Sequence, residues 1–486
     1  RGYAMSSADF IALSPLLVLS AATALLMLQI AFLRSVTFSA LLAAVGLALA
    51  ALSCVYAAPQ APLQVTPLLL LDHLALLFCA LFSLAGAVTV LLSLDYIQCH
   101  GDEPEEYFLL LILSTLGACV LACANHLASL LLGLELLSIA LYALIAYPNK
   151  SLLPLEAATK YLVLSGAAVA MMLFGFALLY ASTGTLSFAE LGARLAQLPA
   201  TDPVLMIGAA MAFAGLAFKL SAVPFHLWTP DVYSGAPAPV TGFLASVGKA
   251  AVLLVLLRLF LEADLFRYRI LVELVGLMAI LSMLAGNLLA LLQTNIKRML
   301  AYSSIAHIGY LLIVFMVSLD AGSRALGIEA AAFYLVAYTV TTLAAFGLLT
   351  LISARQAERE NVELHHINGL FWHAPLLAGL MMVALLSLAG IPLTAGFIAK
   401  FYIFSAAVSG HNWILLGALI VGSGISIYYY LRVVYHMSRK PEQHHPQPTA
   451  RGYWLVRSLA CLLIVAILLL GTLPQALMSY LRSILS

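Results

Sequence analysis

Long apolar runs are the feature that most constrains how this chain can fold. Fourteen of them follow one another along 486 residues, separated by polar or Pro/Gly-containing stretches. A bilayer core about 30 Å thick needs roughly 20 apolar residues per helical span, so the runs predict an all-α polytopic membrane protein of about fourteen transmembrane helices. The predicted helices are 9–33, 37–57, 67–95, 107–122, 125–147, 155–182, 204–227, 236–262, 268–292, 298–319, 326–354, 372–408, 411–437 and 452–479.

Composition agrees with the bilayer as solvent and excludes several functions. Apolar residues make up 64% of the chain and charged residues 9%, with a net charge of +1. No basic surface for nucleic acid, no nucleotide-binding glycine pattern and no C-x-x-C pair is present, so we expect no cofactor and no metal in this chain. The polar connections are too short for a soluble domain, which predicts a single transmembrane domain over residues 1–486.

Positive residues in the loops and at the ends predict the orientation. Nine of these Lys and Arg residues fall on one predicted side of the membrane and six on the other. This difference favours both termini outside. The nine are Arg34, Lys150, Lys297, Arg298, Arg355, Arg359, Arg439, Lys440 and Arg451.

Two prolines inside apolar runs predict broken helices. Pro224 interrupts helix 7 and Pro392 interrupts helix 12. Proline removes a backbone hydrogen bond, and a break survives in lipid only where protein or water satisfies the freed groups. An offset of five helices makes helices 7 and 12 antiparallel, which predicts two inverted five-helix repeats, helices 4–8 (107–262) and 9–13 (268–437). Two unrelated proline kinks are the alternative.

Four ionisable residues within apolar runs are the main functional candidates. Each costs about 2.5–3.5 kcal/mol to insert, so a role is expected by default. They are Glu135, Lys219, Lys249 and Lys400. For the lysines, snorkelling to the interface is the alternative.

A buried lysine next to a movable carboxylate can load and release a proton. Desolvation favours the neutral amine, whereas a carboxylate favours the ammonium. At about 4 Å and an effective dielectric near 20, the attraction is roughly 4 kcal/mol, enough to decide which form dominates. Movement of Glu135 relative to Lys219 is therefore the physical core of the functional hypothesis.

Three further residues are secondary relay candidates. Lys160 begins the apolar part of helix 6 and is equally well explained as a snorkelling lysine. His226 follows Lys219 by two helical turns and suits proton transfer, or caps the break. His307 is a relay candidate or a hydrogen-bonded core histidine.

Other polar features are interpreted as structural. Asp72 and Asp95 flank helix 3 at the interface, and Cys119 and Cys123 are interpreted as apolar packing. The paired histidines of two loops and an acidic run are interpreted as solvated: His365, His366, His444, His445, Asp102, Glu103, Glu105 and Glu106.

Several segments resemble the antiporter-like subunits of respiratory complex I, the proton-pumping NADH:quinone oxidoreductase. They are 124–130 leading to Glu135, 218–233, 235–240, 293–298 and 302–304. The stretches 387–392, 396–397 and 400–402 resemble the subunit N branch in particular, and an end directly after helix 14 is expected for that branch.

The resemblance implies fourteen helices with two inverted repeats. It implies that Glu135 partners Lys219, that Lys249 is the central relay residue, and that Lys400 faces an outward half-channel. It also implies that FMN, iron–sulfur clusters and the quinone pocket lie in partner subunits, and that the partners are other membrane-arm subunits of a bacterial inner-membrane complex. A subunit of a multi-chain cation/proton antiporter, or a structural subunit without its own proton path, are the alternatives.

Overall fold

A computed structural model describes residues 5–100, 104–148, 152–199, 202–353, 362–440 and 453–485, and it is almost entirely helical. The elements are α1 (Ser7–Ala12), α2 (Ser14–Phe32), α3 (Val36–Ala57), η1 (Ala58–Gln60), β1 (Leu63–Thr66), β2 (Leu69–Leu71), α4 (His73–His100), α5 (Pro104–Cys123), α6 (Leu127–Ala146), α7 (Leu152–Thr183), α8 (Phe188–Leu195), α9 (Pro203–Leu220), α10 (Trp228–Gly235), α11 (Ala238–Phe243), η2 (Leu244–Gly248), α12 (Lys249–Glu262), η3 (Leu265–Arg267), α13 (Arg269–Leu291), α14 (Ile296–Val317), α15 (Ala321–Ser353), η4 (Leu364–Ile367), α16 (Leu370–His373), α17 (Pro375–Ala389), α18 (Ala395–Ser409), α19 (Trp413–Ser438), α20 (Tyr453–Thr472) and α21 (Gln475–Leu485).

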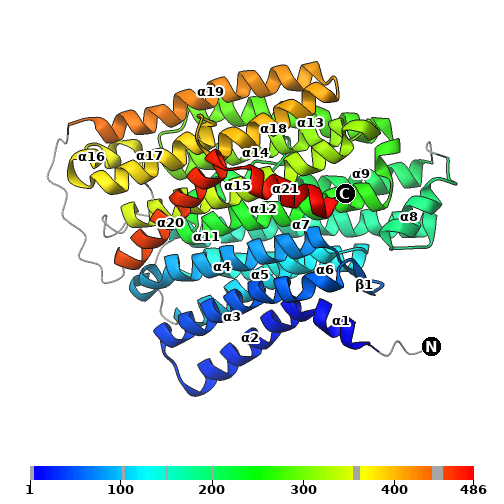
Figure 1. The fold of residues 1–486 in the computed structure, drawn as a ribbon, viewed down its shortest axis with the longest axis horizontal. Coiled ribbons are helices and arrows are strands. Elements are labelled where there is room, and N and C mark those ends of the chain that lie inside the picture. The colour runs from blue at the N-terminus through cyan, green and yellow to red at the C-terminus, as the bar shows by residue number, and fades with distance from the viewer. Residues whose placement is uncertain are drawn as a thin grey trace. The chain divides into compact units, whose positions relative to one another are not determined.

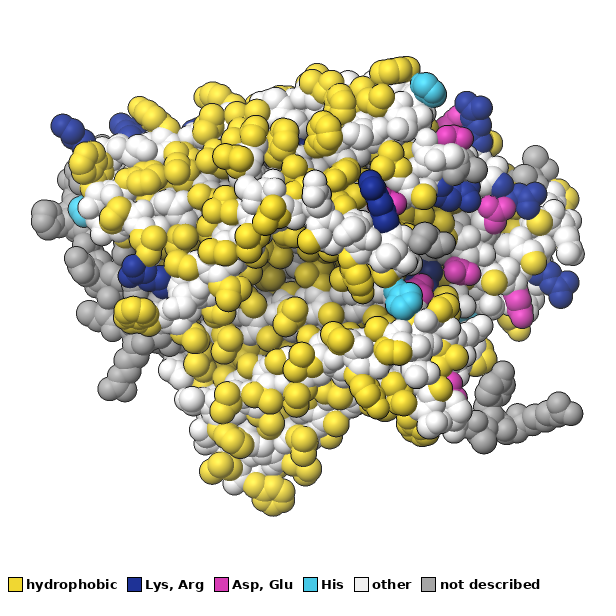
Figure 2. Space-filling model, viewed as in Figure 1, with side chains coloured by type: hydrophobic (Ala, Val, Ile, Leu, Met, Phe, Trp, Pro, Cys, Tyr) yellow, Lys and Arg dark blue, Asp and Glu magenta, His cyan; other side chains and the backbone are white. Residues whose placement is uncertain are grey.

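The helices are long and apolar enough for a many-spanning membrane protein. In the described part of the chain, 13 helices meet the length and composition of a span, and the shorter α17 and α18 together supply one more. Each corresponds to one of the fourteen predicted helices. Figure 2 shows hydrophobic side chains over most of the visible surface, with the charged ones gathered near the helix ends. The number and length of these helices confirm the predicted all-α polytopic fold, and their apolar surface is suited to lipid.

Helices 7 and 12 are both broken where the prolines predicted. α9 ends at Leu220 and α10 begins at Trp228, with Pro224 between them. α17 ends at Ala389 and α18 begins at Ala395, with Pro392 between them. These non-helical stretches leave backbone groups that the rest of the protein has to satisfy.

The chain divides into two compact units. Unit 1 comprises Arg1–Asn149, Thr159–Leu220 and Val247–Arg267, and unit 2 comprises Lys150–Ala158, Ser221–Ser246 and Tyr268–Ser486. In unit 1, helices α2 to α6 pack in chain order, each against the next (Figure 1). In unit 2, α13 packs along α14, and α15 contacts α17, α18 and α20. The division does not follow the predicted repeat boundaries, because the chain leaves unit 1 at the break after α9.

Several predicted helix starts are wrong, and two of them have a clear physical cause. Helix 3 does not begin at residue 67, because β1 and β2 form an antiparallel hairpin up to Leu71 and Asp72 then caps α4 by accepting from the Ala75 amide at 2.7 Å. Helix 4 begins three residues early, at Pro104, since proline and acidic residues both favour a first helical turn. Glu105 and Glu106 are therefore not loop residues; Asp102 and Glu103 lie outside the described residues.

Two further expectations need correction at the other end of the chain. Helix 14 does not continue to residue 479: α20 ends at Thr472, and α21 starts after Pro474 as a separate short helix. Lys297 is not a loop charge, because it lies in the first turn of α14 and its side chain is fully buried. Its place in the count of positive residues is thus wrong.

Candidate functional site

Glu135 is carried by α6, whose start is fixed by a capping histidine. The His126 Nδ1 atom accepts a hydrogen bond from the Ala128 amide at 3.1 Å. Burial lowers the pKa of His126, which favours the neutral imidazole that can accept this bond. Two residues before Glu135, Gly133 allows α6 to approach α5 so closely that a Cβ there would lie 3.0 Å from the Leu121 amide nitrogen. The capped start of α6 and its close packing on α5 therefore set the position of the carboxylate.

Lys219 is held in a pocket of hydroxyl groups within unit 1. Its Nζ atom donates to Ser138 Oγ at 2.6 Å, to Ser165 Oγ at 2.5 Å and to Tyr142 Oη at 3.4 Å. The same Nζ lies 5.7 and 5.6 Å from the ring centres of Tyr142 and Tyr161. Three acceptors satisfy the three donors of an ammonium, so the pocket can hold the charged lysine inside the protein.

Glu135 and Ser138 are one helical turn apart on α6, which places the carboxylate beside this pocket. Glu135 interacts electrostatically with Lys219. Its Oε1 atom is nevertheless buried without a hydrogen-bond partner among the described residues, and the Lys219 hydrogen bonds go to hydroxyls instead. The structure brings the two predicted partners into one site but keeps them apart.

Lys249 is the first residue of α12 and follows directly after the π-helical segment η2. Its side chain is 1% exposed, and the most apolar part of the span Ala238–Glu262 is buried throughout. Single π-helical turns in α-helices are frequent at functional sites because they change the direction in which the next side chains point. The predicted burial of this lysine is observed, and it does not reach the surface by snorkelling.

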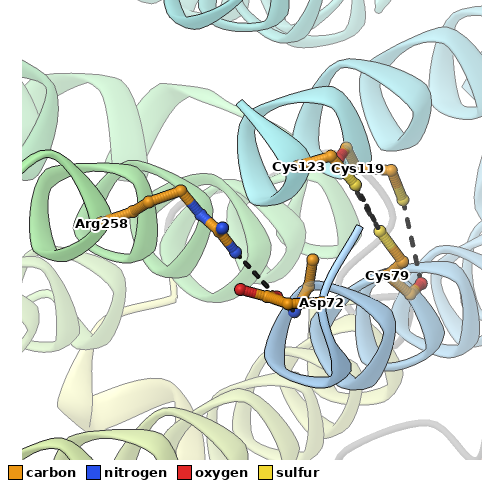
Figure 3. Close-up of polar contacts among 6 residues, drawn as sticks. Asp72, Cys79, Cys119, Cys123 and Arg258 are labelled. Atoms are coloured by element: carbon orange, nitrogen blue, oxygen red, sulfur yellow. Dashed lines mark hydrogen bonds and ion pairs between the residues drawn. The ribbon is translucent and has the colours of Figure 1, made fainter. Parts of the chain in front are cut away.

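The sequence analysis missed a partly buried ion pair between α12 and the start of α4. Arg258 is 5% exposed, and its Nη2 atom lies 2.9 Å from Asp72 Oδ1 at the start of α4 (Figure 3). Asp72 therefore has a structural partner on α12. The apolar run 250–261 contains Arg258, so the insertion-cost criterion that selected the lysines was sufficient to find it.

The cysteines near this ion pair pack as expected. Cys79 Sγ lies 3.8 Å from Cys123 Sγ, and Cys119 Sγ lies 3.8 Å from the Cys79 carbonyl (Figure 3). All three side chains are buried. Among the described residues, no group of three or more His, Cys, Asp or Glu side chains is arranged to hold a metal ion.

In unit 2, Lys400 on α18 lies at the break in helix 12. Its Nζ atom donates to the Ala389 carbonyl at 2.8 Å, and it lies 5.1 Å from the ring centre of Tyr310. The Ala389 carbonyl belongs to the last residue of α17, so the lysine satisfies one of the groups freed by the break. Gly390 follows with φ +85°, and a Cβ there would meet Lys400 Cδ at 2.8 Å.

His307 on α14 lies among tyrosines. Its Nδ1 atom is 2.6 Å from Tyr334 Oη, and its ring centre is 5.1 Å from that of Tyr338 and 5.6 Å from that of Tyr310. Tyr310 thus contacts both His307 and Lys400. The structure brings these two predicted residues into one polar cluster through this tyrosine.

A second set of hydroxyls extends the same cluster. Tyr338 Oη donates to Ser304 Oγ at 2.7 Å, and Ser303 Oγ is hydrogen-bonded to Tyr430 Oη. Ser303, Tyr338 and Thr342 line a cavity of about 10 Å³. That is the space required by one water molecule, and three hydroxyls are enough to bind it.

The remaining sequence candidates occupy different settings. His226 is buried in the break between α9 and α10, where its carbonyl accepts from the Thr229 amide at 3.0 Å. Lys160 is exposed on α7. His365 is exposed and lies 3.4 Å from Glu363, whereas His444 and His445 lie outside the described residues.

Comparison with known proteins identifies the family. The family model described as NADH:quinone oxidoreductase/Mrp antiporter, TM matches residues 124–426. NADH-quinone oxidoreductase subunit N of Methylococcus capsulatus is 50% identical over 434 residues, which cover 89% of this chain and 87% of that protein. The chain belongs to this family, in its subunit N branch.

Solved structures of antiporter-like subunits share the fold. A chain of respiratory complex I from Thermus thermophilus with bound aureothin is 33% identical, with a TM-score of 0.80, and the match covers 96% of this chain and 99% of that one. Chains of the archaeal membrane-bound sulfane sulfur reductase (24% identity, TM-score 0.80) and of the Mrp complex from Dietzia sp. (19%, 0.81) have the same fold. Their coverage is 98% or more of this chain.

Two of the stretches that carry the sequence resemblance, one to antiporter-like subunits in general and one to subunit N, contain site elements. The stretch 218–233 contains Lys219, the break in helix 7 and most of α10, and 387–402 contains the break in helix 12 and Lys400. What the sequence reasoning did not find were the hydroxyl partners of Lys219. Ser138, Tyr142 and Ser165 come from two other helices, and only Ser138 and Tyr142 have a detectable signal, their spacing of one and two turns from Glu135.

Proposed function

We propose that this chain is a proton-translocating subunit of the membrane arm of a bacterial NADH:quinone oxidoreductase. The complex transfers electrons from NADH through FMN and iron–sulfur centres in other subunits to quinone, and is thus a translocase. The observation that carries the proposal is the buried Lys219 with its hydroxyl pocket beside Glu135. The expectation of redox partners rests on the subunit N relative, which is 50% identical over most of the chain.

The relay works by changing the distance between opposite charges. In the observed arrangement Lys219 is stabilised as an ammonium by hydroxyl groups. When Glu135 approaches, the lysine holds its proton more tightly, and when the carboxylate withdraws the proton is released. Lys249 is the central carrier and Lys400 the last, with Lys160, His226 and His307 as secondary members.

The two breaks give the relay its polar environment. Pro224 and Pro392 prevent continuous helices, which leaves free backbone groups at membrane depth. The inverted repeats cover 107–262 and 268–437 within one transmembrane domain, and residues 452–479 contain the final span. The Lys400 contact with the Ala389 carbonyl supports this proposal, because the proposed last carrier sits at such a break.

The surroundings of the chain follow from the same assignment. The partners are the other antiporter-like and small membrane subunits, the lipid bilayer and, indirectly, the peripheral redox arm. No cofactor is bound by this chain, and it does not bind nucleic acid. The protein lies in the bacterial inner membrane with both termini on the periplasmic side.

A cation/proton antiporter subunit is the competing function, because the Mrp complex chain from Dietzia sp. has the same fold. Purification of the tagged chain from its native membrane under mild detergent distinguishes the two. We expect flavin- and iron–sulfur-containing subunits and NADH:quinone reductase activity in the same fraction. Sodium/proton exchange by a fraction without redox subunits would support the antiporter. A fraction that shows neither activity would support a structural subunit.

A further inference from the structure

Lys297 is a buried lysine that the proposed relay does not use. Its side chain is fully buried at the start of α14. The Nζ atom donates to the Ala236 carbonyl at 2.7 Å and to the Ser234 carbonyl at 3.5 Å. Both carbonyls lie at the C-terminal end of α10, the half-helix that follows the break in helix 7. Lys297 therefore caps this half-helix from a neighbouring helix.

The next residue makes a second contact with the same half-helix. Arg298 Nη1 lies 2.6 Å from Asp231 Oδ1, and both side chains are about one-third exposed. Asp231 precedes Ser234 by almost one helical turn. Helix α14 thus contacts α10 at two points, through two adjacent basic residues.

α10 depends on such contacts for its position. It has eight residues, about 12 Å of helix, and begins directly after a non-helical stretch. Helices this short are marginal on their own, so tertiary contacts decide where they lie. Cations are favourable at a helix C-terminus, where the unpaired carbonyls carry partial negative charge.

The position of α10 controls a contact with the polar cluster around His307, here called the His307 cluster. Tyr233 on α10 places its hydroxyl 3.5 Å from Ser304 Oγ. Ser304 follows Lys297 by seven residues, so the two lie on the same face of α14 about 10 Å apart. Ser304 accepts from Tyr338, whose ring contacts His307. Because 3.5 Å is the outer limit of a hydrogen bond, a small shift of α10 breaks this connection.

We propose that Lys297 and Arg298 are positioning residues that set the register of α10 on α14. Their clamp holds Tyr233 against Ser304 and so connects the second half of the broken helix to the His307 cluster. In this proposal Lys297 holds α10 in place and does not carry protons. The effect on pumping rests on the proposed function; the clamp itself does not.

Replacement of Lys297 distinguishes a positioning role of this residue from a proton-carrying role. We expect Lys297→Met to lower protons pumped per electron at least about fivefold in the assembled complex, because the C-terminal carbonyls lose their cation. Lys297→Arg keeps a cation with several donors, and we expect it to retain more than half of the wild-type ratio. Wild-type pumping in Lys297→Met, or an equal loss in Lys297→Arg, would overturn the proposal.

Two further variants cover the case in which Lys297→Met fails to assemble. Tyr233→Phe removes one hydroxyl and leaves the clamp intact, and we expect reduced pumping; unchanged pumping contradicts the connection to Ser304. Exchanging the charges, as Arg298→Asp with Asp231→Arg, should restore the heat resistance of the complex that each single change lowers. This readout does not involve pumping, so it tests the clamp even if the proposed function fails. Failure of the exchange to restore heat resistance would reject the clamp.

Discussion

Single hydroxyl groups determine whether Lys219 can stay charged inside the membrane domain. The ammonium donates to Ser138 and Ser165 at short distances, while the Glu135 carboxylate acts without a direct bond. Hydrogen bonds to a charged group are worth about 1.5–3 kcal/mol each. The hydroxyls are therefore as important to the charge of the lysine as the carboxylate is.

Removing these hydroxyls should weaken the relay without changing a charge. We expect Ser138→Ala combined with Ser165→Ala to lower proton pumping at least about tenfold, because the buried ammonium loses two acceptors. Pumping is measured by quenching of a pH-sensitive dye in vesicles energised with NADH. Ser458→Ala, which removes an exposed hydroxyl from α20, serves as the control and should pump normally. Normal pumping by the double variant would show that the pocket is not needed.

At this scale the sequence was informative about charged residues and poor on their neighbours. The insertion cost of a charge in an apolar run identified Glu135, Lys219, Lys249 and Lys400, and three of these side chains are less than 9% exposed. It did not identify Lys297, because a lysine at the end of a predicted helix is indistinguishable from a loop residue. Serine and tyrosine have little insertion cost, so the pocket around Lys219 needed the tertiary structure.

Broken helices are the elements on which the site is built. Proline predicted both breaks correctly, since its missing N–H and its ring act locally. The hairpin before α4 was not predicted, because a few apolar residues have no distinct period for strand or helix. Helix ends that depend on caps, such as Asp72 for α4, were off by several residues for the same reason. The separation of α21 from α20 was not predicted either, although Pro474 marks it.

The break in helix 12 should depend on Gly390. Its φ of +85° is costly for a residue with a side chain, and a Cβ would press on Lys400 at 2.8 Å. We expect Gly390→Ala to lower the free energy of unfolding by about 1–2 kcal/mol and to reduce pumping. Gly379→Ala in α17 is the matched control: its Cβ would meet no atom within 4 Å, so the helix should be unchanged or slightly stabilised. The rate of heat inactivation of the complex compares the two variants. Equal heat resistance of Gly390→Ala and Gly379→Ala would contradict this account of the break.

For the whole molecule, the hydrophobic pattern was sufficient to predict the class of fold. Spans of about 20 apolar residues leave few alternatives in a bilayer, and the predicted helices correspond one by one to those of the structure. The division into two compact units was not predicted, because it depends on where α10 and α11 pack rather than on the order of the helices. The repeat boundaries and the orientation remain predictions.

The central claim is that buried lysines of this chain carry the pumped protons, and Lys249 tests it most directly. NADH-driven proton pumping should be measured in membrane vesicles with Lys249→Ala, together with electron transfer to quinone and the amount of assembled complex. Lys440→Ala, which removes an exposed lysine after α19, is the control. We predict that the assembled Lys249→Ala complex loses pumping and coupled turnover while the control keeps both. Pumping and turnover at wild-type levels in Lys249→Ala would contradict the relay and leave this chain with a mainly structural role.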